Sequence, residues 1–196
     1  MIEKTKNFIF KALLLNNELE ALEEIGVISK QIPIIGNDGD SKKEGMISIE
    51  DFSSQIRLNA IKMSSIYTVF FAFENSVREL IKERLSERRG IDWWKKFVSK
   101  PTRKKVQERQ EKDDKNKWHS PRAKDDISYA DFGDMSDIIT KNWIYFDDLF
   151  PSQDWIKTRL DDLEQSRNVI AHNNVLSERD IQRIIMYLQD WLSQVG

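Results

Sequence analysis

Residues 49–88 have the sequence IEDFSSQIRLNAIKMSSIYTVFFAFENSVRELIKERLSER, and this stretch decides the fold. Its apolar side chains recur every three or four residues, which is the spacing of one face of an α-helix. They are Phe52, Ile56, Met63, Ile66, Phe70, Phe73, Val77, Leu80 and Ile81. We therefore predict one long helix from about Ile49 to Arg88 that forms the centre of a core and ends at Gly90.

The rest of the chain has few helix breakers, with seven glycines, four prolines and no sustained alternation of polar and apolar residues. The same spacing predicts further helices over residues 4–24, 101–116, 129–141, 143–149 and 152–171, and a short element begins at Trp93 and Trp94. Ser177 and Asp180 fit the first turn of a last helix. We expect an all-α protein, in which residues 1–48 form an N-terminal helix and a flexible loop and residues 49–196 form a helical domain.

The composition limits the class of protein. The 196 residues, of which 39% are hydrophobic, are enough for one core. There is no cysteine and there are only two histidines, so disulfides and thiolate metal sites are excluded and a histidine-rich zinc site is not expected. No phosphate or dinucleotide fingerprint occurs, and we expect neither a metal nor a cofactor. No segment has the roughly twenty apolar residues of a membrane span, so we expect a cytoplasmic protein without membrane attachment.

Charge is unevenly distributed along the chain. Residues 93–124 carry a net charge of +8, and residues 125–196 carry −8. The basic arm at 93–124 has Trp93, Trp94 and Trp118 near its ends, so it is a candidate surface for RNA phosphates and stacked bases. Its candidate RNA-binding residues are Lys95, Lys96, Arg103, Lys104, Lys105 and Arg109, accompanied by Lys100, Lys112, Lys115 and Lys117. The alternative is a solvated helix that balances the acidic half.

The predicted penultimate helix contains an unusual pair. Arg167 falls in its apolar stripe, and His172 follows five residues later. A buried arginine needs a partner, and histidine exchanges protons near neutral pH, so the two suit RNA cleavage. On a continuous helix they would point about 140° apart, which argues against one copy forming the site. The alternative is an arginine that caps helix carbonyls and a histidine that acts as a charge at the helix C-terminus.

Glu74 interrupts the apolar stripe of the long helix, with Arg78 one turn further on. One interpretation makes Glu74 a supporting partner of Arg167 or His172. The other is a pair with Arg78 on the helix surface, worth a few tenths of a kcal/mol.

Several segments together resemble the HEPN superfamily (higher eukaryotes and prokaryotes nucleotide-binding domains). They are residues 73–81, 129–139, Asn142, Trp143, Phe146 and the motif at 167–173, and they are similar to the branch found in a eukaryotic nuclear RNA-quality-control endonuclease and in many bacterial defence proteins. The resemblance spans about residues 50–195 and implies a HEPN-like helical bundle with a long central helix, in which the basic arm is a helical insertion.

The resemblance implies metal-independent cleavage of RNA through attack of the 2′-hydroxyl, which leaves a 2′,3′-cyclic phosphate. Arg167 would then stabilise the phosphorane, His172 would transfer protons, and Asn168 would orient the phosphate or hold His172. It also implies a homodimer whose two motifs share one cleft. A toxin of this kind would need an antitoxin or another regulatory protein. The alternative implied by the resemblance is a non-catalytic dimerisation, nucleotide-binding or RNA-binding subunit of a larger assembly.

Overall fold

The computed structural model describes residues 49–195 except 117, 119 and 121–124, so the predicted helix over 4–24 and the loop after it lie outside the described residues. The described residues form six α-helices and three short 3-10 turns, with no strand among them, which confirms the all-α prediction. The helices are α2 (Ser54–Arg89), α3 (Trp93–Phe97), α4 (Lys100–Lys115), α5 (Phe132–Lys141), α6 (Gln153–Ala171) and α7 (Glu178–Val195). The turns are η1 (Ile49–Asp51), η2 (Asp126–Tyr129) and η3 (Trp143–Tyr145). None of the described helices combines the length and hydropathy needed to cross a membrane.

The chain divides into two compact units, residues 1–69 and 70–196, and α2 crosses the boundary. In the first unit the described residues are η1 and the beginning of α2. The predicted helix from Ile49 starts later because Ser53 forms its cap, with the Ile56 N–H donating to Ser53 Oγ at 3.5 Å. The difference between the predicted start at Ile49 and the observed start at Ser54 is thus a matter of local turn chemistry.

The apolar stripe of α2 is buried only in part. Phe52 is 49% exposed and Ile56 is 56% exposed, so the prediction that the stripe serves as a core over its whole length is wrong at its start. In the second unit one face of α2 is buried, at Phe70, Phe73, Val77, Leu80, Ile81 and Leu85, whereas Phe71 is 65% exposed. Periodicity identifies the apolar face of a helix but not which turns of it are covered.

Aromatic side chains join four helices of the second unit. Phe73 on α2 stacks on Phe132 of α5 with ring centres 6.0 Å apart and meets the edge of Trp191 on α7 at 5.2 Å. Phe150 stacks on Trp191 at 5.5 Å and on Trp155 of α6 at 5.9 Å. Because such pairs add to the stability from burial, this cluster fixes α2, α5, α6 and α7 around one core.

The segment after α5 is not the helix predicted over 143–149. The chain makes only the 3-10 turn η3 there, because α5 ends at Asn142 and the backbone then turns back on itself. The Asn142 side chain is 5% exposed, and its Nδ2 donates to Ile138 O at 2.8 Å and to Phe97 O at 3.1 Å. Phe146 is fully buried, whereas Trp143 is only partly buried. Asn142 therefore ties the end of α3 to the end of α5.

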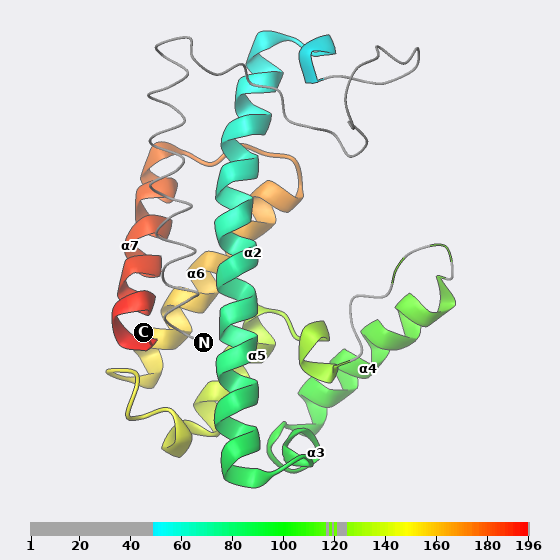
Figure 1. The fold of residues 1–196 in the computed structure, drawn as a ribbon, viewed down its shortest axis with the longest axis vertical. Helices are drawn as coiled ribbons and strands as arrows, with labels where there is room; N and C mark the ends of the chain where they lie inside the picture. Colours follow the sequence, from blue (N-terminus) through cyan, green and yellow to red (C-terminus); the bar gives the residue numbers. More distant parts are fainter. Residues whose placement is uncertain (1–48, 117, 119, 121–124, 196) are drawn as a thin grey trace, which may run out of the picture. The chain divides into compact units, whose positions relative to one another are not determined.

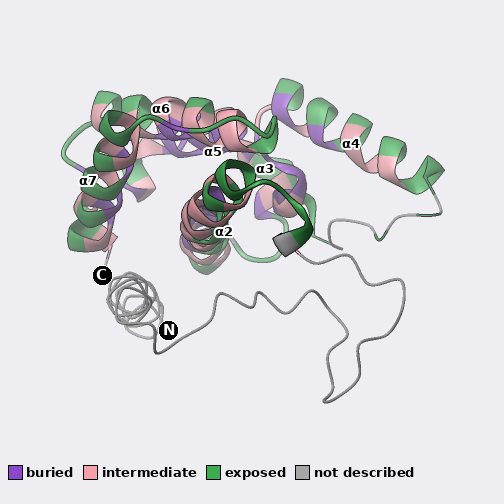
Figure 2. Cartoon of the chain, turned by 90° about the horizontal axis from the view of Figure 1, so that it is seen from above, coloured by how far each residue is buried: buried purple, intermediate pink, exposed green. Residues whose placement is uncertain are grey.

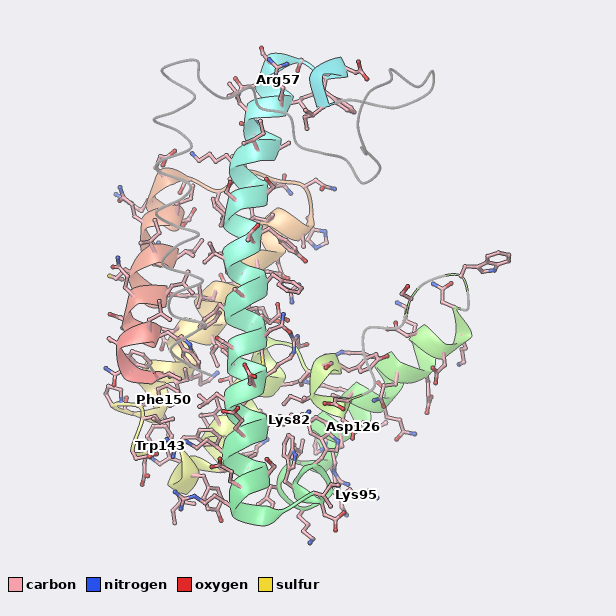
Figure 3. All side chains as sticks on the ribbon, in the orientation of Figure 1. Arg57, Lys82, Lys95, Asp126, Trp143 and Phe150 are labelled. Atoms are coloured by element: carbon pink, nitrogen blue, oxygen red, sulfur yellow. The ribbon has the colours of Figure 1, made fainter. Side chains whose placement is uncertain are left out.

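The basic arm is helical, as predicted, and consists of α3 and α4. Helix α4 contacts η2 and then extends away from the other helices of the second unit, with most of its residues exposed or partly exposed (Figure 1, Figure 2). Asp126 of η2 lies beside it (Figure 3) and accepts a hydrogen bond from Gln110 Nε2 at 2.9 Å. Thr102 and Val106 are its buried residues.

Candidate functional site

The end of α6 presents the Arg167 and His172 motif. Ser152 caps the start of this helix, accepting from the Trp155 N–H at 3.1 Å, and His172 is the residue that ends it. The next residue, Asn173, has φ +58, which is the left-handed conformation that asparagine tolerates. The Asn173 N–H donates to Ile170 O at 2.9 Å and the Asn174 N–H donates to Val169 O at 3.0 Å. These two bonds form a Schellman motif, which fixes the backbone on both sides of His172.

Arg167 lies half-buried at the junction of α6 with α2 and α5. Its Nη1 donates to Asn168 Oδ1 at 3.0 Å, and its Cζ lies 5.9 Å from the centre of the Phe132 ring. Its Nε is 3.8 Å from Glu74 Oε2, too far for a hydrogen bond, and this buried nitrogen has no hydrogen-bond partner. The guanidinium is therefore held in position while several of its five donors stay unused.

Glu74 links two arginines. Its Oε1 accepts a hydrogen bond from Arg78 Nη2, and its Oε2 faces Arg167. Arg78 also donates to Ala130 O at 2.9 Å, which connects α2 to the residue that follows η2. The carboxylate is 17% exposed and the Arg78 side chain 15%, so this is more than a solvated surface pair. Both arrangements considered for Glu74, a pair with Arg78 and a contact with Arg167, occur together.

His172 is not part of this cluster in a single copy of the chain. It is exposed, and its imidazole makes no hydrogen bond or ion pair with the described residues. Asn168 gives its side-chain oxygen to Arg167 rather than to His172; only its backbone oxygen accepts from the His172 N–H, at 3.0 Å. The structure thus brings together Arg167, Asn168, Glu74 and Arg78, and leaves the histidine free.

An acidic group beside Arg167 has no counterpart in the sequence-based interpretation. Glu164 precedes Arg167 by one helical turn, and burial, followed by repulsion from Asp131, raises its pKa, although Arg167 acts in the opposite direction. A Cβ atom on Gly133 would lie 3.6 Å from Glu164 Oε2 and 3.7 Å from Asp131 Oδ1. The carboxylates therefore approach α5 where it carries no side chain.

Asp131 and Asp134 form the start of α5. They make a capping box, in which the Asp134 N–H donates to Asp131 Oδ1 at 2.9 Å. Asp134 is only 2% exposed. The pattern of two aspartates three residues apart before a helix is the sequence signal that could have identified this cap.

Arg109 from the basic arm is bound to these aspartates. Its Nη2 donates to Asp131 Oδ2 at 2.5 Å, and its Nη1 donates to Asp134 and to Tyr129 O, the latter at 2.8 Å. Its guanidinium is therefore engaged in holding α4 to the start of α5. This placement gives Arg109 a structural role and leaves its guanidinium engaged with α5 rather than available to RNA.

The other arm residues differ in how freely they are presented. Lys95 is exposed, Lys96 is 3.7 Å from Asp92, and Lys104 is 3.7 Å from Glu108. Lys105 reaches to 3.6 Å from Asp134 with its side chain 63% exposed, and the Arg103 Nε is buried without a hydrogen-bond partner. Of the tryptophans considered for stacking, Trp93 is buried against Trp94, whereas Trp118 is 95% exposed. Lys117 and His119 lie outside the described residues.

The described residues contain no group of three or more His, Asp or Glu side chains placed to hold a metal ion. Comparison with known proteins adds a family assignment. A model of the family described as Swt1-like HEPN matches residues 68–196, which include Glu74, Arg78, the capping aspartates and the whole motif at the end of α6. No curated protein matches the chain, and no solved structure does.

Proposed function

Because this chain belongs to the Swt1-like HEPN family, we propose that it is a metal-independent endoribonuclease of the defence or toxin kind that acts on cytoplasmic RNA. HEPN domains are often ribonucleases or nucleotide-binding modules. In the proposed reaction the ribose 2′-oxygen attacks the adjacent phosphorus and the bond to the 5′-oxygen breaks. One base takes the 2′-hydroxyl proton, and one acid donates a proton to the leaving 5′-oxygen. The products are a 2′,3′-cyclic phosphate and a 5′-hydroxyl.

The observation that carries this proposal is the state of Arg167. Its side chain is 24% exposed and half enclosed by Glu74 and Phe132, yet among the described residues only Asn168 accepts a hydrogen bond from its guanidinium. Unused donors on a positioned guanidinium suit a phosphate, which accepts two parallel N–H bonds from arginine. The same donors would stabilise the extra negative charge of the phosphorane.

His172 supplies the proton transfer. Its backbone is fixed by the Schellman motif and its imidazole is exposed, so it is accessible to a bound strand. Within one copy the side chains of Arg167 and His172 point in different directions, because α6 continues to Ala171 and residues five apart lie about 140° apart around a helix. A two-fold dimer that places the ends of two α6 helices together would supply both an acid and a base, and would set Arg167 of one copy opposite His172 of the other.

The competing function is a non-catalytic dimerisation, nucleotide-binding or RNA-binding subunit of a larger assembly. The separation of Arg167 from His172 within one copy favours it, because a chain that never dimerises through this region has no complete site. Detection of dimers and measurement of cleavage separate the two functions.

The experiment is cleavage of total RNA and of a tRNA pool in EDTA by the wild type, Arg167→Ala, His172→Ala and the control Arg183→Ala. Arg183 is a matched control because it lies on α7, is 42% exposed and, within the part of the chain that the structure describes, pairs only with Asp180 of its own helix. We expect cyclic-phosphate ends from the wild type and the control, and loss of about 100-fold or more in rate from each of the other two. Equal cleavage by wild type and His172→Ala, or none by any protein, would contradict the proposal.

We also propose that a separate regulatory protein or a triggered state restrains this activity in the cell. Induced expression of the wild type is then expected to slow growth more than expression of His172→Ala. Equal growth of the two strains would count against toxicity without bearing on the chemistry.

A further inference from the structure

Positive charge in the arm is concentrated where α3 meets α4. Residues 93–107 contain six lysines and arginines and no acidic residue, whereas residues 108–115 contain four acidic residues and three basic ones. We call the six residues the basic corner; they are Lys95, Lys96, Lys100, Arg103, Lys104 and Lys105. Lys95 is seen at α3, near the start of α4 (Figure 3). The arm is therefore a basic corner followed by a balanced helix, and not a uniformly charged rod.

The charges of the basic corner are largely uncompensated. Lys95 and Lys100 are exposed and make no ion pair with the described residues. The partners of Lys96 and Lys104 lie 3.7 Å away, on side chains that are all at least 60% exposed. Exposed pairs of this kind are weak, so they would yield readily to a stronger anion.

The corner is also unfavourable for the helix that carries it. Ser99 caps α4, and the first turn after it contains Lys100 and Arg103 and no acidic residue. A helix N-terminus carries partial positive charge, so cations there oppose the macrodipole. Such a conflict between local sequence and local structure is expected where function requires it.

The basic corner is held rigidly. On its buried side Val98 is 4% exposed, Thr102 is 2% exposed and Val106 is 1% exposed. The Asn142 side chain holds α3 through Phe97 O, and Arg109 holds α4 through the start of α5, as described above. A charged surface on anchored elements loses little conformational entropy when it binds.

We propose that the basic corner binds the phosphate backbone of the substrate RNA outside the cleavage site. This inference rests on the proposed function, from which the ligand is taken. Arg109 is bonded to Asp131, the neighbour of the Phe132 ring that lies against Arg167. Lys105 and Lys100 precede Arg109 by four and nine residues, about 6 Å and 14 Å along a helix.

The test compares two pairs of substitutions on the same helix. Lys100→Gln/Lys104→Gln removes two charges from the basic corner, and Lys112→Gln/Lys115→Gln removes two exposed charges from the balanced half. Both pairs are placed in His172→Ala protein so that a labelled single-stranded RNA survives the measurement. Binding is followed by fluorescence anisotropy over a series of salt concentrations, with circular dichroism melts to show that both variants are folded.

We expect the corner pair to weaken binding roughly 10- to 30-fold at 0.1 M salt and to reduce the slope of log affinity against log salt by about 1.4, and the control pair to change neither appreciably. Equal effects of the two pairs, no effect of the corner pair, or no binding by the His172→Ala parent would overturn the inference. Failure of RNA binding by the basic corner is distinguishable from failure of the proposed function. Cleavage in EDTA can persist with the corner irrelevant, and RNA can bind the corner without ever being cleaved.

Discussion

Replacement of Arg109 by methionine is expected to be the most damaging single change to the arm. Methionine keeps the unbranched stem but removes the guanidinium that bonds Asp131, Asp134 and Tyr129 O. Asp134 is 2% exposed, so its carboxylate would keep little access to water once Arg109 is gone. The loss of one partner of such a buried pair leaves a charge without compensation.

The size of the destabilisation by Arg109→Met depends on the charges that remain around Asp134. Breaking a buried ion pair costs about 3–5 kcal/mol. Lys105 stays 3.6 Å from the Asp134 carboxylate and Arg109 itself is 25% exposed, which places this case at the lower end, about 3 kcal/mol. For a chain of this length that corresponds to a fall in Tm of roughly 6–12 °C. With Asp134 changed to asparagine, the same Arg109→Met substitution is expected to cost only about 1 kcal/mol.

The assay is urea unfolding followed by far-ultraviolet circular dichroism for the wild type, the two single variants and the double variant. Lys104→Met serves as the control, because Lys104 is 79% exposed and lies 3.7 Å from Glu108, so its loss is expected to cost less than about 0.5 kcal/mol. Two results would contradict a strong pairing of Arg109 with Asp134. One is a cost for Arg109→Met no larger than that for Lys104→Met, and the other is a coupling energy with Asp134 below about 0.5 kcal/mol.

Three further predictions concern stability and are measured by the same unfolding assay. Because the pKa of Glu164 is raised in the folded chain by burial and by Asp131, the stability it contributes at low pH is lost as pH rises through that pKa. The free energy of unfolding of Glu164→Gln should therefore rise relative to that of the wild type as the pH is raised from 4 to 7. A difference between the two that does not change with pH would contradict this. Gly133→Ala is expected to stabilise α5 by about 0.5 kcal/mol, since the nearest side-chain atoms would lie at ordinary contact distances of 3.6 and 3.7 Å; destabilisation would show that they cannot adjust. Gly90→Ala is expected to cost about 1 kcal/mol because Gly90 has φ +73, although nothing lies within 4 Å of the added methyl group; an unchanged midpoint would contradict this.

Helix positions could be predicted from the sequence wherever local rules decide them. The helix predicted to begin at Ser152 starts there, with Ser152 as its cap, and Ser177 caps α7 as predicted, accepting from the Asp180 N–H at 3.2 Å. The family assignment likewise follows motifs that the resemblance already used, although the matched region begins at residue 68. Prediction failed at the exposed start of α2 and after Asn142, because burial depends on what packs against a segment and not on its own pattern.

The residues of the candidate site were likewise predictable from the sequence only in part. Arg167 and Glu74 were identifiable because each is a charged residue in an apolar stripe, and a charge in such a position needs a partner. The bond between Arg109 and the aspartates of α5 was not, because it joins residues more than twenty positions apart, and the net charge of the arm suggested RNA binding for Arg109 instead. Charge counted along a sequence does not show which charges are already paired in the fold.

We propose that Arg167 of one copy and His172 of another cleave RNA together. The most direct test is to co-express Arg167→Ala and His172→Ala chains with different affinity tags, to purify the mixed dimer, and to measure RNA cleavage in EDTA. Each variant alone is expected to be inactive. The mixed dimer retains one Arg167 opposite one His172, so it should cleave RNA measurably faster than either parent, though more slowly than the wild type, and leave cyclic-phosphate ends. A mixed dimer as inactive as its parents, or a failure of the two chains to associate, would contradict a cleavage site shared between two copies.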